Sequence, residues 1–173
     1  TTVPNPLGGP TGLVFAEGRL VAWRQDPGSP AAVTLDTATG TVTGTLAGLA
    51  APLLQLEPAS GSLVSLDRTG TVRLVALPGA AAAGDSGRPL FDAWLPGTLC
   101  VLAISDRELV GGRTPIGSGG GGTLLRINMR TGETVAVPGS SRSTYDLAWD
   151  AARGKLYSLG VDAAGDTVLT GHE

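Results

Sequence analysis

Few residues in this sequence have the types and spacing that catalysis or metal binding requires. The chain of 173 residues holds one histidine, His172, and one cysteine, Cys100. A Ser-His-Asp site needs a histidine held between two partners, and zinc sites draw on several His and Cys ligands. We therefore expect no catalytic residue, no metal and no bound cofactor. Cys100 lies in the apolar run TLCVLAIS and is predicted to be a buried core residue.

The carboxylates are concentrated in turns. Asp162 and Asp166 share one hairpin, GVDAAGDT. Calcium takes six to eight oxygen ligands, which is more than this hairpin offers, so a solvated turn is predicted there. The run GSGGGG at 117–122 is followed by the strand-like TLLRINM. A phosphate-binding loop needs a helix at that point, so the run is predicted to be a mobile hairpin tip.

One six-residue pattern occurs twice and indicates how the chain is organised. Residues 35–40 read LDTATG and residues 127–132 read INMRTG, and their Thr-Gly pairs lie 92 residues apart, twice 46. An Asp or Asn at a turn entrance accepts hydrogen bonds from the turn's backbone, and the glycine takes the left-handed conformation. A structural turn role is therefore predicted for Asp36, Thr39, Gly40, Asn128, Thr131 and Gly132.

The repeat extends over the whole chain. Short β-rich runs alternate with Gly, Asn and Asp turns, as in antiparallel hairpins. Equivalent first strands begin near Thr11, Ala51, Thr98 and Ser143, at steps of 40, 47 and 45 residues. Such a period is typical of propeller blades, which must stack because one blade cannot bury its own faces. One domain over 1–173 is predicted, with blades at about 10–50, 51–97, 98–142 and 143–173.

These repeats resemble the YVTN and quinoprotein-like β-propeller families, and more loosely WD-type propellers. The stretch AAVTLDTATGTVTGTLAGLAAP at 31–52 is the most similar. The resemblance implies an all-β propeller, in families that include scaffolds, sensors, lactone-cleaving enzymes and quinone-dependent dehydrogenases. The tryptophan-docking motif of quinoprotein repeats is missing after Gly40 and Gly132, so no quinone is expected. Trp149-Asp150 ends a first strand, where the WD signature does not belong.

The predicted fold is a β-propeller of about four blades, three complete and one without its outer strand. We expect it to be part of a seven- or eight-bladed ring. One alternative is a closed four-bladed ring in which residues 1–4 supply the last outer strand. A β-sandwich or β-barrel is the other, because short strands at 8–12 residue spacing fit those folds too.

Charge and hydropathy limit the classes of partner that this chain can bind. The net charge is −3, and the eleven arginines are scattered, so the basic stripe that nucleic acid requires is missing. The apolar runs are shorter than the roughly 20 residues that span a bilayer, and no signal peptide is visible. A soluble chain in an undetermined compartment is predicted, with no nucleic acid and no membrane span.

The function predicted from these observations is non-catalytic recognition of a protein or ligand within a larger protein or complex. The expected partner is the rest of the parent protein, or another chain that completes the propeller. The alternative is a fragment of a propeller enzyme, a lactonase-like hydrolase or a quinoprotein dehydrogenase. Aromatic and arginine side chains are frequent at binding hot spots. The predicted contact residues are Trp23, Arg24, Trp94 and Arg113.

Overall fold

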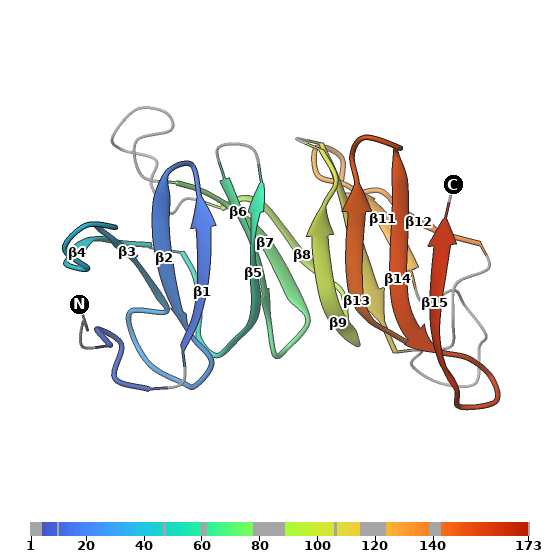
Figure 1. Ribbon diagram of the computed structural model, residues 1–173, viewed down its shortest axis with the longest axis horizontal. Coiled ribbons are helices and arrows are strands. Elements are labelled where there is room, and N and C mark those ends of the chain that lie inside the picture. Colours follow the sequence, from blue (N-terminus) through green and yellow to red (C-terminus); the bar gives the residue numbers. More distant parts are fainter. Residues whose placement is uncertain are drawn as a thin grey trace. The chain divides into compact units, whose positions relative to one another are not determined.

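The computed structural model describes residues 5–9, 11–46, 48–59, 62–77, 89–105, 107–114, 124–138 and 143–172. Every element in these ranges is a β-strand, so the all-β prediction is confirmed (Figure 1). Residues 1–4 and 117–122, predicted above to be an outer strand and a hairpin tip, lie outside the described residues. The chain divides into two compact units, Thr1–Asp92 and Ala93–Glu173.

The first unit begins with a four-stranded antiparallel sheet of order β1-β2-β3-β4. A two-residue turn joins its first hairpin. Glu17 and Gly18 there have φ of 48° and 74°, the positive values of the turn type that suits twisted hairpins. The strands are β1 (Thr11–Ala16), β2 (Arg19–Arg24), β3 (Ala32–Leu35) and β4 (Val42–Thr45).

A second sheet of order β5-β6-β7-β8 packs on one face of the first. Leu56, Leu63 and Val75 of this sheet join Val21 and Trp23 of the first in one buried cluster. Burial of such apolar side chains contributes about 1.5–3 kcal/mol each. The strands are β5 (Leu53–Ala59), β6 (Ser62–Asp67), β7 (Thr71–Ala76) and β8 (Pro89–Trp94).

The second unit holds two further antiparallel sheets, of order β12-β11-β10-β9 and β13-β14-β15. Val110 and Leu124 of one sheet pack against Leu156 of the other, with Leu147 and Trp149 around them. The strands are β9 (Thr98–Ala103), β10 (Glu108–Arg113), β11 (Leu124–Asn128), β12 (Thr134–Ala136), β13 (Ser143–Asp150), β14 (Lys155–Val161) and β15 (Thr167–His172).

Each of the four sheets is formed by one continuous stretch of the sequence. Each sheet is a meander, because strands that follow one another in the chain lie side by side in the sheet. The fourth sheet has three strands, as expected for a blade without its outer strand, and Trp149-Asp150 ends its first strand. No helix in the described part of the chain is long and apolar enough to cross a membrane.

Candidate interaction surface

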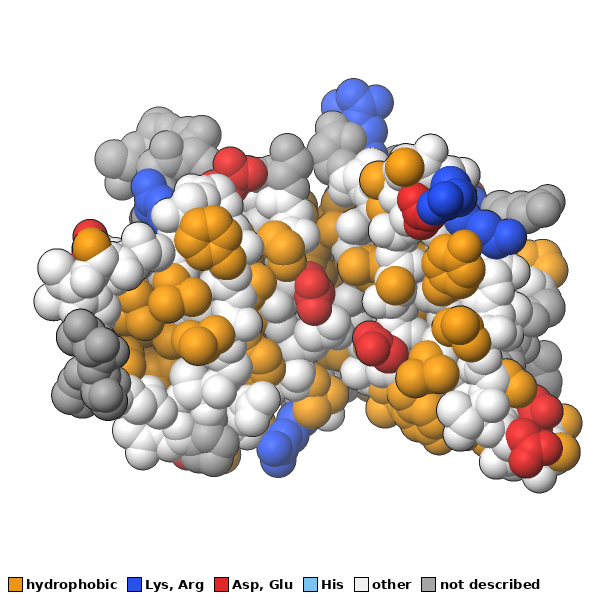
Figure 2. All heavy atoms as spheres, viewed as in Figure 1, with side chains coloured by type: hydrophobic (Ala, Val, Ile, Leu, Met, Phe, Trp, Pro, Cys, Tyr) orange, Lys and Arg blue, Asp and Glu red, His pale blue; other side chains and the backbone are white. Residues whose placement is uncertain are grey.

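The first sheet turns a largely apolar face away from the second sheet. Strand pairing places Leu13 opposite Ala22, and Phe15 opposite Leu20. Side chains opposite each other project from the same face of a sheet. The side chains between them along the strands, such as Val14 and Val21, project from the other face into the buried cluster. Leu13 is 64% exposed and Phe15 62%. Figure 2 shows hydrophobic side chains gathered over β1 and β2.

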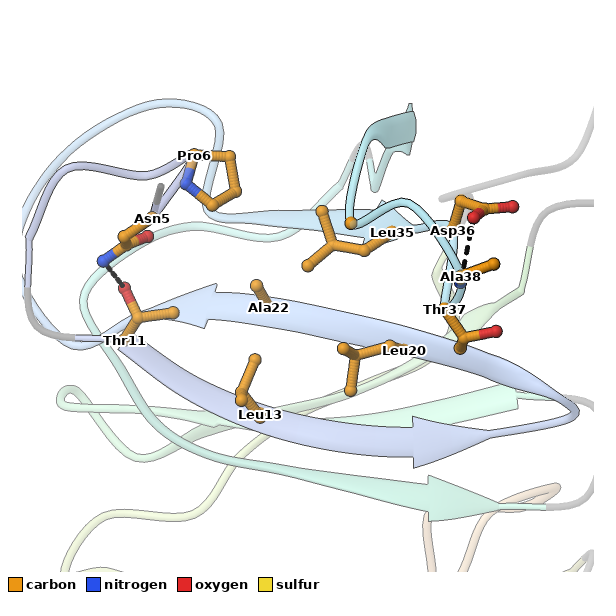
Figure 3. Close-up of a pocket in the computed structure, with 11 residues that line it drawn as sticks. Asn5, Pro6, Thr11, Leu13, Leu20, Ala22, Leu35, Asp36, Thr37 and Ala38 are labelled. Atoms are coloured by element: carbon orange, nitrogen blue, oxygen red, sulfur yellow. Dashed lines mark hydrogen bonds between the residues drawn. The ribbon is translucent and has the colours of Figure 1, made fainter. Parts of the chain in front are cut away.

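A hollow of about 470 Å³ lies in this face. Its floor is apolar, and Leu20 pairs with Leu35 across β2 and β3. Figure 3 shows the leucines directed into the space between the two ends of the hollow. This volume is within the range of small-molecule sites and side-chain pockets. The floor consists of Leu13, Leu20, Ala22 and Leu35, and the rim of Asn5, Pro6, Thr11, Asp36, Thr37, Ala38 and Gly40.

One end of the hollow is the Asp36 turn. Asp36 Oδ1 accepts hydrogen bonds from the backbone N–H of Thr39 at 2.7 Å and of Ala38 at 3.0 Å, and from Thr39 Oγ1 at 2.9 Å. The Thr39 backbone bond is the main cause of the lowered pKa of the Asp36 carboxyl. Gly40 closes the turn at φ of 70°, and its N–H donates to Asp36 O at 2.8 Å. The carboxylate is therefore engaged within its own turn.

The other end is held by the Asn5 side chain. Its Nδ2 donates to Gly9 O at 2.8 Å and to Thr11 Oγ1 at 2.9 Å, and its Oδ1 accepts from Leu7 N–H at 3.0 Å. This places Leu7 on the same face of the sheet, against Ala22 and neighbouring side chains. Part of the face is therefore covered by the chain itself, and the hollow beside Leu7 is left open.

The Asn128 turn of the second unit forms in the same way. Asn128 Oδ1 accepts from the N–H of Arg130 at 2.9 Å and of Thr131 at 3.2 Å. Gly132 has φ of 74°, and its N–H donates to Asn128 O at 2.8 Å. Both copies of the motif thus reverse the chain through local hydrogen bonds, which is a structural use of these polar side chains.

His172 and Ser158 form a buried pair in the fourth sheet. Ser158 Oγ and His172 Nε2 lie 2.8 Å apart, with the side chains 1% and 7% exposed. Burial lowers the pKa of His172, which favours the neutral imidazole. The pair resembles the base and nucleophile of a hydrolase, but the serine is closed to solvent. A cavity of about 50 Å³ beside His172 is lined by Arg126 and Trp149 among others.

Cys100 is buried between the third and fourth sheets. It is 3% exposed, and its Sγ lies 3.9 Å from Thr144 O. Burial raises the pKa of the thiol to about 12, so the reactive thiolate is disfavoured at neutral pH. Cys100 is therefore the buried core residue that the sequence predicts. Among the described residues, no group of three or more His, Cys, Asp and Glu side chains is arranged to hold a metal ion.

Two of the four predicted contact residues, Trp23 and Arg24, end β2. Trp23 is 7% exposed and packs in the core between the first two sheets, so its position favours packing over partner contact. Arg24 Nε bonds Asp26 Oδ1 at 3.1 Å and keeps 17% of its side chain exposed. A Cβ on Gly28 would lie 2.4 Å from Arg24 Cζ, so the guanidinium rests on a glycine of the following loop.

The other two predicted contact residues belong to different strands. Trp94 ends β8 and is 68% exposed. Arg113 ends β10 and is half-buried. A contact role for these four residues stays a prediction. Sequence reasoning did not select Leu13 and Phe15, although their alternation in TGLVFA was a signal that both lie on one face of β1.

No protein-family model matches this chain, and no curated protein matches it. Similar solved structures exist. The computationally designed Ika4 protein has a TM-score of 0.64 at 17% identity over 95% of this chain and 92% of its own. The β-propeller domain of Cps50 (Swd1) from Myceliophteria thermophila has a TM-score of 0.64 at 14% identity over 88% of this chain. The WD40 β-propeller domain of Doa1 has a TM-score of 0.59 at 12% identity over 92% of this chain.

These similarities define the fold class. This chain spans 51% of the Cps50 structure and 59% of the Doa1 structure. Identities this low carry the fold and nothing about activity. Together with the four successive meanders, they show that the chain adopts a β-propeller fold. In the described residues its blades are the four sheets, three of them with four strands and the last with three.

Proposed function

We propose that this chain is a non-catalytic β-propeller module that recognises another protein within a larger assembly. The observation that carries the proposal is the open apolar face of the first blade, with Leu13 and Phe15 more than three-fifths exposed around a hollow of about 470 Å³. Contiguous exposed apolar surface of this kind marks interaction sites. The resemblance to YVTN and quinoprotein-like repeats supports a module of this class.

The chemistry of the face favours a protein partner. Its floor is aliphatic, and the Asp36, Asn5 and Thr11 side chains at its rim are engaged in the Asp36 turn and the Asn5 loop. Interface cores are depleted in charge and well packed, and an aliphatic or aromatic side chain of a partner suits a floor of leucines. Trp94, which is 68% exposed, and the partly exposed Arg24 and Arg113 are proposed as further contacts.

The proposal is tested by placing a photo-crosslinking amino acid at position 13 and expressing the chain in the cells of its natural source. The matched control carries the same probe at Val135, which is also apolar, on a strand and 57% exposed. We expect a defined protein to crosslink from position 13 and not from position 135. That protein, purified, should bind the wild-type chain, and Leu13→Asp should weaken binding at least tenfold.

Two outcomes would count against the proposal. One is equal crosslinking from both positions, because the face would then have no selectivity. The other is turnover of lactones, or of alcohols with a quinone acceptor, by the purified chain, which would favour the hydrolase or dehydrogenase alternative. The buried positions of Ser158, His172 and Cys100 support the non-catalytic proposal.

A further inference from the structure

The open face of the first blade is the same face that other blades bury against a preceding blade. Counted from the hairpin turn, the pair Leu13–Ala22 in the first blade is equivalent to Leu56–Ser65 in the second. Leu56 lies in the cluster that joins the second blade to the first and is 3% exposed, whereas Leu13 is 64% exposed. The first blade therefore presents a packing face of the same type, which Leu7 covers in part and on which Leu13 stays exposed.

The fourth blade leaves the opposite type of face open. In its third strand Leu169 pairs with Leu159. The equivalent third-strand residues are Ala32 in the first blade and Leu124 in the third, which lie in the clusters that join those blades to the next ones. Both are 0% exposed, whereas Leu169 is 71% exposed and Leu159 is 40% exposed. Hydrophobic side chains also gather over this sheet in Figure 2.

The chain thus carries both halves of an interface that it already makes within each unit. Within the first unit, the face of the Ala32 type packs on the face of the Leu56 type. Within the second unit, the Leu124 face packs on the sheet of Leu147 and Leu156. Two unlike faces that fit each other support head-to-tail association between copies, which closes into a ring or extends as a chain.

We infer that the partner of the Leu13 face is a second copy of this chain, which docks its Leu159–Leu169 face there. This inference rests on the proposed function and names the partner. The hollow between Leu13, Leu20 and Leu35 receives the leucines of the second copy, since it is the concave part of the face. A second copy fits this face because the two interfaces within the units are formed by the same strand positions.

Single-face variants test the inference by sedimentation velocity over a concentration series. Wild type should sediment as two or more copies, at least twice 17.3 kDa. Leu13→Asp and Leu169→Asp should each reduce the mass to one copy, because either substitution removes one half of every interface. A 1:1 mixture of the two variants should form a dimer again, since an intact Leu13 face and an intact Leu169 face then meet once. Val135→Asp, the matched control, should behave as wild type.

The design separates the possible failures. A wild type that stays monomeric at every concentration overturns the inference, and so does self-association that survives Leu169→Asp. A crosslink from position 13 to a different protein, with a monomeric wild type, overturns the second copy and leaves the proposed function standing. Both substituted leucines are mostly exposed, so folding should be retained. Circular dichroism checks this, and Leu13→Ser with Leu169→Ser replaces any variant that does not fold.

Discussion

Gly112 should be one of the least replaceable residues in the second unit. It lies on β10 opposite Cys100, on the face that packs against the fourth blade. A Cβ at this position would lie 2.6 Å from Cys100 Sγ and 2.7 Å from Thr144 Cγ2. Overpacking of this kind costs about 1–3 kcal/mol. The entropy that Ala removes from the unfolded chain offsets about 0.4–1 kcal/mol of that cost, so we expect Gly112→Ala to be destabilising.

The adjacent Gly111 provides the matched control. A Cβ there would meet Ile127 Cδ1 at 3.6 Å and Thr98 Cγ2 at 3.8 Å, which are ordinary contacts. Neither glycine has a positive φ, so Ala adopts both backbones. Gly111→Ala should leave the melting temperature unchanged or raise it. Gly112→Ala should lower it by about 2–4 °C for each kcal/mol lost.

Thermal unfolding of both variants decides the question. Adding Cys100→Ala to Gly112→Ala should recover part of the loss, because it removes the closer of the two clashing atoms. Equal melting temperatures for Gly111→Ala and Gly112→Ala would refute the close packing of the third blade on the fourth.

Three further predictions concern titratable groups. Burial lowers the pKa of His172, so the unfolded chain binds the proton more tightly and stability should fall as pH drops below about 6.5. The urea unfolding midpoint of His172→Val should not show this part of the pH dependence; valine is chosen because Val75 occupies the equivalent position of the second blade. The backbone N–H and the hydroxyl of Thr39 lower the pKa of Asp36, so its NMR titration midpoint should lie below that of the denatured chain. Thr39→Ala removes only the hydroxyl bond and should return the midpoint part of the way. Cys100, with its pKa raised to about 12, should react with a thiol reagent at pH 7 slowly in the folded chain and rapidly in urea, and equal rates would contradict its burial.

The turns and the strand order could be predicted from the sequence because their causes are local. Asp36 and Asn128 bond backbone groups within four residues, and such turns need no distant partner. The open face was not predicted, since which side of a sheet is covered depends on the neighbouring sheet. In RLVAWR, strict alternation groups Trp23 with Val21, and both are buried, whereas Leu13 on the neighbouring strand lies on the other face.

The pairing of Ser158 with His172 also depends on tertiary structure. The two residues are 14 positions apart, and the antiparallel register of β14 and β15 brings them together. In the equivalent positions of the second blade stand Ser65 and Val75, so the local repeat gives no sign of a histidine partner. The sequence therefore gives no indication that His172 is buried beside a serine.

The central claim is that each repeat folds into its own meander. Cross-strand nuclear Overhauser effects in solution test it most directly. The account predicts contacts for Leu13 with Ala22, Leu56 with Ser65, Val110 with Leu102 and Leu147 with Ser158. Backbone contacts that instead join the strands of different repeats into two facing sheets would contradict it.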